Sequence, residues 1–188
     1  MAQLILEPTP QAQWQALVQE AQSVCDLRLD ESLESYLVFM LMRFADKPHC
    51  MARIMAEDYL NSQTLIGEQR AGMLREVGDH CLLFSGFFPQ LAERRLVRIS
   101  YFVNIGRAAY RQLSDGLDRG WSSMYGHLSD TFIVLVDILH AMRGLGGAAA
   151  LTPLQAMDLW LETGSRRCYQ QVCAEGRAIP VAIDSEKH

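Results

Sequence analysis

Apolar side chains recur along this chain at spacings of three and four residues, which is the period of an amphipathic α-helix. Seven segments show the period, and each is bounded by glycine, proline or a residue that caps helices. The pattern predicts helices over residues 10–26, 31–45, 50–60, 67–84, 100–114, 121–143 and 153–175. The chain is therefore expected to be all-α, an irregular helical bundle of about six or seven helices.

Two of these helices begin with the same local signal. Thr9-Pro10 and Thr152-Pro153 each place a hydroxyl at the capping position and a proline at the first helical position. Proline fits there because the first backbone N–H groups of a helix have no partner within the helix. The turn Ser85-Gly86-Phe87-Phe88-Pro89 is expected to end the fourth helix.

Two helices carry apolar residues on nearly every side, which is typical of buried helices. They contain the segments Tyr36–Met42 and Tyr101–Tyr110, and we expect both to be central. In the second, only Asn104, Arg107 and Arg111 form a polar stripe. Gly106 lies inside this helix, where glycine costs about 1 kcal/mol relative to alanine. A neighbouring helix is therefore expected to approach closely at Gly106.

Length and composition favour one folded domain spanning residues 1–188. The chain has 188 residues, 49% of them hydrophobic, and no linker-like stretch separates two halves. Residues 1–8 and 177–188 are expected to be extended or flexible tails. The only strand alternative is a short ribbon between residues 4–6 and 178–183.

Several features favour the cytoplasm. The first eight residues lack the basic and apolar regions of a signal peptide. The longest apolar runs fall far short of the roughly 20 residues that span a bilayer. The five cysteines are odd in number and form no Cys-x-x-Cys motif, so reduced thiols are expected. The net charge of −5 disfavours general binding to nucleic acid or anionic lipid.

A basic segment is the strongest charge feature. It contains five arginines and no acidic residue, with aromatic residues interleaved: Arg94, Arg95, Arg98, Arg107 and Arg111. Three interpretations stay open. The arginines pair with carboxylates of this chain, they rim a protein interface, where arginine is favoured, or they contact an anionic ligand or nucleic acid.

A metal site is the main chemical alternative. Glu76 and His80 are four residues apart, and Asp137 and His140 are three apart, so each pair lies on one helix face. A bundle that holds metal between helices uses carboxylates and histidines in this way. No nucleophile elbow or glycine-rich phosphate loop occurs in a suitable context. No cofactor is expected, and the balance leans away from an enzyme.

Three blocks of sequence carry a resemblance. They are Gly78-Asp79 followed by Ser85-Gly86-Phe87-Phe88-Pro89, then Tyr101-Phe102 with Gly106–Tyr110, and then Trp160–Arg167. Over residues 57–181 the chain resembles a family of uncharacterised bacterial all-helical proteins. The resemblance implies a single helical domain, and it carries over no activity and no site residue.

The sequence thus predicts a non-enzymatic helical protein that acts by binding a protein partner, as an adaptor or regulator or as a homodimer. The nine methionines and the many apolar helix faces favour adaptable interfaces. The alternative is a small-molecule-binding or metal-binding bundle, with enzymatic activity left open, that uses Glu76, His80, Asp137 and His140.

Overall fold

A computed structural model describes residues 9–45, 55–89, 97–116 and 119–175 of the chain. Within these ranges it contains nine helices and no strand. They are α1 (Pro10–Cys25), α2 (Glu31–Ala45), α3 (Met55–Ser62), α4 (Gly67–Phe87), α6 (Ile99–Gly116), α7 (Arg119–Asp130), α8 (Phe132–Leu145), α9 (Pro153–Thr163) and α10 (Arg166–Glu175). The all-α prediction is confirmed, whereas the predicted number of helices is too low.

The difference in number comes from two predicted helices that each break in two. The first breaks at Thr131, whose hydroxyl donates to the carbonyl of His127 at 2.6 Å. Such side-chain bonds to the preceding turn bend helices, and α8 begins one residue later. The second breaks at Gly164, which adopts a left-handed conformation with φ +74°. Residues with a side chain rarely adopt this conformation, so glycine ends α9 there.

The two threonine–proline signals mark helix starts, as predicted. Thr9 Oγ1 accepts a hydrogen bond from the backbone of Ala12 at 3.2 Å. Thr152 and Gln155 form a reciprocal pair, in which each side chain bonds the other residue's backbone N–H. These caps satisfy backbone donors that a helix start leaves unpaired.

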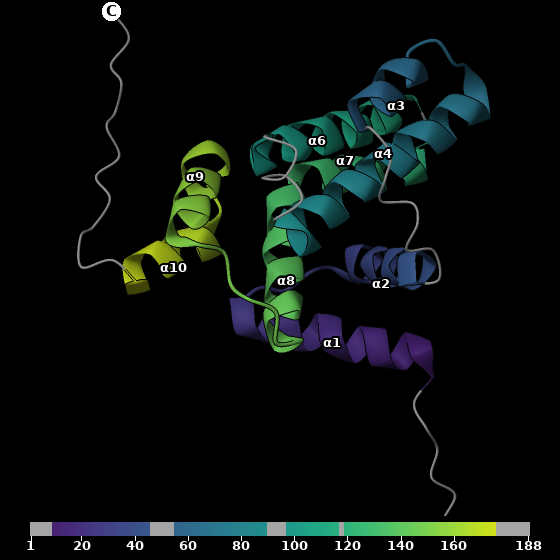
Figure 1. Cartoon of the computed structure of the whole chain (residues 1–188). Coiled ribbons are helices and arrows are strands. Elements are labelled where there is room, and N and C mark those ends of the chain that lie inside the picture. Colours follow the sequence, from purple (N-terminus) through teal and green to yellow (C-terminus); the bar gives the residue numbers. More distant parts are fainter. Residues whose placement is uncertain (1–8, 46–54, 90–96, 117–118, 176–188) are drawn as a thin grey trace, which may run out of the picture.

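The core is centred on α4, α6 and α8 (Figure 1). Residues 77–86 of α4 and 135–143 of α8 are buried without interruption. The predicted close approach at Gly106 is confirmed. A Cβ atom there would lie 2.5 Å from the ring of Phe132 and 2.8 Å from Cys81 Cβ. Glycine therefore lets α6 pack against α4 and the start of α8.

Helix α2 is less central than its apolar pattern predicts. Leu33, Leu37 and Leu41 are buried, but the side chain of Phe39 is 57% exposed. One side of α2 stays exposed because this helix packs mainly on α1 and α7 at one side of the molecule (Figure 1). Helix α6 keeps the predicted polar stripe, and Asn104, Arg107 and Arg111 are all exposed.

The last helices flank the core on the side away from α3. Helices α9 and α10 pack on each other, and α10 also contacts α8, on the left of Figure 1. Helix α8 extends to α1, so the first described helix packs against the seventh. The predicted tails and the ribbon between residues 4–6 and 178–183 lie outside the described residues.

Candidate functional site

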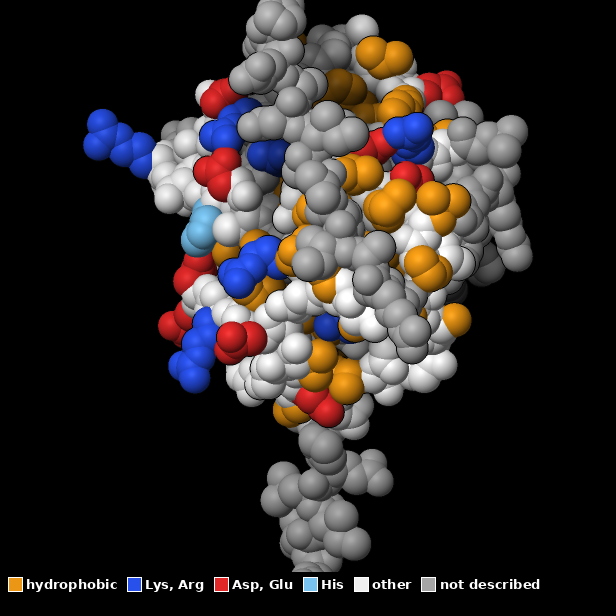
Figure 2. Space-filling view, turned by 90° about the vertical axis from the view of Figure 1, so that its left-hand side faces the viewer, with side chains coloured by type: hydrophobic (Ala, Val, Ile, Leu, Met, Phe, Trp, Pro, Cys, Tyr) orange, Lys and Arg blue, Asp and Glu red, His pale blue; other side chains and the backbone are white. Residues whose placement is uncertain are grey.

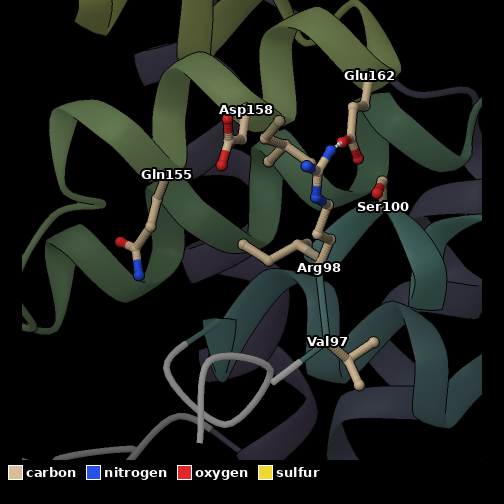
Figure 3. Close-up of a pocket in the computed structure, with 8 residues that line it drawn as sticks. Val97, Arg98, Ser100, Gln155, Asp158 and Glu162 are labelled. Carbon is tan, nitrogen blue, oxygen red and sulfur yellow. Dashed lines mark hydrogen bonds and ion pairs between the residues drawn. The ribbon is translucent and has the colours of Figure 1, made fainter. Parts of the chain in front are cut away.

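The predicted arginine segment makes contacts within the chain. The guanidinium of Arg98 reaches across to α9 and pairs with the carboxylate of Glu162 (Figure 3). Arg111 donates to Asp130 Oδ1 at 2.5 Å, and Arg107 Nε donates to the carbonyl of Ser129 at 3.2 Å. Arg94 and Arg95 lie outside the described residues. Arg98 and Arg111 thus contact carboxylates of this chain, whereas Arg107 contacts a backbone carbonyl.

A small pocket of about 120 Å³ surrounds Arg98 between α6 and α9. Asp158 and Glu162 supply carboxylates to its wall, and Figure 3 shows both on the α9 side of Arg98. A hydrogen bond from Ser100 and the adjacent guanidinium of Arg98 lower the pKa of the Glu162 carboxyl. Two carboxylates against one arginine make this pocket unfavourable for an anion.

Helices α9 and α10 carry exposed apolar side chains on their outer face. Leu154, Met157 and Leu161 are spaced three and four residues apart on α9, and their side chains are 65%, 37% and 59% exposed. Tyr169 of α10 is also exposed, and its ring lies 5.1 Å from that of Trp160. Figure 2, which looks onto this side of the molecule, shows hydrophobic side chains gathered among charged ones. We call these residues the α9–α10 face.

The residue pattern of α9 places apolar side chains on its outer side as well as its inner side. Ala156 and Leu159 are fully or almost fully buried and fix the inner side of the helix against the core. A soluble helix usually carries polar residues opposite its buried stripe. On α9 the outer positions include Leu154 and Leu161 instead, so the helix is apolar on two sides.

The four residues of the predicted metal alternative do not form one cluster. His80 Nδ1 hydrogen-bonds the carbonyl of Glu76 in its own helix at 2.6 Å, and its ring packs edge-on against Phe44. Among the described residues, the one group of three side chains that brings metal-binding atoms together contains Asp137 and His140, joined by Cys168. One ligand atom from each of these three lies within 4.8 Å of the others.

Hydrogen bonds hold the group of Asp137, His140 and Cys168 between α8 and α10. Asp137 Oδ1 accepts from Ser165 Oγ at 2.6 Å, and Ser165 Oγ accepts from the backbone N–H of Cys168 at 3.1 Å. Ser165 therefore caps α10 while it ties that helix to α8. His140 Nε2 lies 2.8 Å from the carbonyl oxygen of Ser85 in α4. We call Asp137, His140 and Cys168 the α8–α10 cluster.

Burial dominates the electrostatics of the α8–α10 cluster. It lowers the pKa of His140 to about 4, so the imidazole is neutral near pH 7. It raises the pKa of Cys168 to about 11, so the free side chain is a thiol. Burial also raises the pKa of Asp137, against hydrogen bonds that favour the carboxylate. A protonated, buried thiol is a poor nucleophile, and the arrangement does not favour a cysteine–histidine catalytic pair.

A buried network around Asp79 was not predicted as a feature of the core. Its Oδ1 accepts from the hydroxyls of Tyr36 at 2.5 Å and Tyr110 at 2.6 Å, and its Oδ2 pairs with the guanidinium of Arg43. Tyr125 packs on both tyrosines, with ring centroids 6.0 and 5.9 Å away. In the sequence, the feature that pointed to this network was an acidic residue, Asp79, within the mostly apolar segment 77–84.

The Asp79 network predicts a loss of stability at alkaline pH. Burial and the Asp79 carboxylate raise the pKa of Tyr36 and of Tyr110 well above the usual value of 10. Below pH 10 the phenol groups of Tyr36 and Tyr110 stay protonated in both the folded and the unfolded chain. Above it the unfolded chain releases these protons and the folded chain does not, so unfolding becomes easier by about 1.4 kcal/mol per pH unit for each tyrosine.

Denaturant unfolding at increasing pH, followed by helical circular dichroism and tyrosinate absorbance, tests this expectation. The phenols of the network should ionise only as the helices melt. Full tyrosinate absorbance in a chain that keeps its native dichroism would contradict the buried network.

Comparisons with known proteins identify no relative. No family model matches the chain, and neither a curated protein nor a solved structure matches it. Among the described helices, none combines the length and the apolar character needed to cross a membrane.

Proposed function

We propose that this chain is a non-enzymatic helical protein that acts through protein–protein contact, and that it pairs with a second copy through the α9–α10 face. The exposed stripe of Leu154, Met157 and Leu161 carries the proposal. Scattered exposed apolar residues are normal on soluble proteins, but a contiguous patch on a regular element is typical of an interaction site.

The size of a stable interface sets how far the contact must extend. Helix α9 has 11 residues and is therefore about 16 Å long. A standard interface buries about 800 Å² on each partner. A single short helix does not supply that area, so the proposed contact includes α10, with Tyr169 and the neighbouring Trp160 as aromatic anchors of the type found at interface centres.

The charges beside the stripe favour pairing of identical copies. In a two-fold interface, the same patch on both copies must be complementary to itself. Helix α9 carries the exposed acid Asp158, and α10 carries the exposed base Arg166. Antiparallel packing of two α9–α10 faces can place the acid of one copy near the base of the other, whereas a patch of one sign would repel itself.

A cytoplasmic location is part of the same proposal. The described cysteines Cys25, Cys81, Cys168 and Cys173 are all free thiols. Free thiols persist in reducing compartments, where disulfides are rare. This supports a location in the bacterial cytoplasm, as expected from the sequence.

Light scattering coupled to size-exclusion chromatography tests the proposed pairing. We expect a dimer at micromolar concentrations, and a monomer for the double variant Leu154→Glu/Leu161→Glu, because two charges per copy would have to be buried without partners. The matched control is Leu60→Glu/Ile66→Glu, which places the same charges on residues that are 66% and 86% exposed on α3 and before α4.

Each outcome bears directly on the proposal. A dimer that persists in the control and is lost in the α9 variant supports it. A wild-type monomer, or equal behaviour of the two double variants, would rule out pairing through the α9–α10 face. Circular dichroism of each variant verifies that its helices are retained.

A further inference from the structure

The His140 ring has a buried nitrogen with no partner. Its Nε2 faces a carbonyl oxygen, which can only accept a hydrogen bond, so Nε2 must carry the ring proton. In the neutral ring, Nδ1 then has a free lone pair. Nδ1 is inaccessible to solvent and makes no hydrogen bond. The residue as a whole is only 8% exposed. Buried polar atoms are normally satisfied, so this lone pair calls for a ligand.

The residues around the ring are those that bind a metal cation. His140 offers an imidazole nitrogen, Cys168 a sulfur atom and Asp137 a carboxylate oxygen, all within 4.8 Å of one another. We propose that the α8–α10 cluster binds one Zn²⁺ ion. This goes beyond the proposed protein contact and does not depend on it, because the cluster is buried and the α9–α10 face is exposed.

The donor set and the charge favour zinc. Nitrogen, sulfur and carboxylate oxygen together suit this borderline-soft cation, whereas magnesium and calcium prefer oxygen ligands. A thiolate and a carboxylate neutralise the two charges of the ion, and they also face the guanidiniums of Arg143 and Arg167 that line the adjoining cavity. The Cys168 thiol releases its proton to solvent when it coordinates.

Small movements would complete the site. Zinc bonds are about 2.0–2.3 Å long, so tetrahedral ligand atoms lie about 3.5 Å apart. The present separations of up to 4.8 Å therefore require shifts of roughly 1 Å. Side-chain rotation at the surface of a small cavity can supply such shifts. This cavity, of about 60 Å³, is lined by His140, Cys168, Arg143 and Gln171.

The same cavity provides a fourth position. One water molecule needs about 10–15 Å³ of cavity volume. The cavity of about 60 Å³ can therefore hold a zinc-bound water. Three protein ligands and one water are the coordination of an open zinc site. Cys25 is a less suitable fourth ligand, since its sulfur contacts the backbone carbonyl of Asp137 and the guanidinium of Arg167.

Groups outside the cluster orient its members, as is usual around metal ligands. The carbonyl of Ser85 fixes the His140 ring, and Ser165 Oγ holds Asp137 Oδ1. A purely structural role explains Asp137, which joins α8 to the start of α10. It does not explain why His140, in the same group as Cys168, has a buried Nδ1 with no partner.

Titration of the chelator-treated full chain with Co²⁺ and Zn²⁺ tests the proposal. Cobalt bound to a thiolate shows a sulfur-to-metal charge-transfer band, and tetrahedral cobalt shows visible d–d bands. We expect both bands at one ion per chain, and their loss when Zn²⁺ is added. Cys168→Ser should abolish the charge-transfer band, and His140→Asn or Asp137→Asn should weaken zinc binding about 100-fold or more, since even outer groups cost 10–100-fold.

Matched substitutions separate this cluster from other thiols and histidines. Cys173→Ser changes an exposed cysteine of the same helix, and His127→Gln changes an exposed histidine. Both variants should bind zinc like the wild type. Failure of the wild type to bind zinc at micromolar concentration, or binding that survives unchanged in Cys168→Ser and His140→Asn, would overturn the proposal. The wild-type cobalt spectrum decides the matter even if a variant fails to fold.

Discussion

Replacing Asp79 with alanine should lower the free energy of unfolding by about 3–5 kcal/mol, because it leaves buried partners without their acceptor. The hydroxyls of Tyr36 and Tyr110 would lose their acceptor inside the core, and the guanidinium of Arg43 would lose its counter-charge. Domains are commonly stable by only about 5–15 kcal/mol. Urea unfolding followed by circular dichroism measures the loss.

Two further variants show whether the network itself is responsible. Asp79→Asn keeps an oxygen for the two tyrosines but removes the charge. Arg43, whose side chain is 34% exposed, can then turn toward water, so we expect a smaller loss than for alanine. Asp130→Ala removes an exposed carboxylate that pairs with Arg111, and such surface pairs contribute about 1 kcal/mol or less. Equal losses for Asp79→Ala and Asp130→Ala would show that the network contributes little.

Replacing Gly106 with valine should destabilise the protein by about 3 kcal/mol, at the upper end of the roughly 1–3 kcal/mol that overpacking a core typically costs. Even the first added carbon would meet the Phe132 ring and Cys81 Cβ at 2.5 and 2.8 Å. These two atoms belong to α8 and α4, so relief requires two helices to move away from α6. The same urea titration measures the effect.

Gly72→Val is the matched control. Gly72 lies inside α4, and a Cβ atom there would meet nothing within 4 Å. Valine has a somewhat higher helix propensity than glycine, by about 0.3–0.5 kcal/mol, so the control should be neutral or slightly stabilising. A control variant as unstable as Gly106→Val would mean that valine harms these helices through propensity and not through close packing.

Local signals were sufficient for most helix starts and insufficient for the breaks. Thr9-Pro10 and Thr152-Pro153 act within a few residues, so the sequence reveals them directly. Gly164 is different, because an isolated glycine is tolerated inside a helix as well as at its end. Its left-handed conformation follows from how α9 and α10 pack, which periodicity does not report. The break at Thr131 likewise lies inside an unbroken apolar pattern.

The same limit applies to the candidate metal cluster. Asp137 and His140 are three residues apart on one helix, and this spacing suffices to predict that they share a face. Cys168 joins them only because the chain reverses at Gly164 and returns α10 to α8. The pair Glu76 and His80 satisfies the same spacing rule but lies on α4, where the His80 ring packs against Phe44. Spacing identifies neighbours within a helix, whereas partners between helices depend on the turns.

The packing of α1 on α8 bears on how the chain folds during synthesis. Val18 and Ala21 of α1 are fully buried, and Cys25 contacts the carbonyl of Asp137, which is 112 residues later. A growing chain emerges from the ribosome with its N-terminus first. Helix α1 is therefore made long before α8, so its packing on α2 can form early, whereas its packing on α8 can form only after α8 has been synthesised.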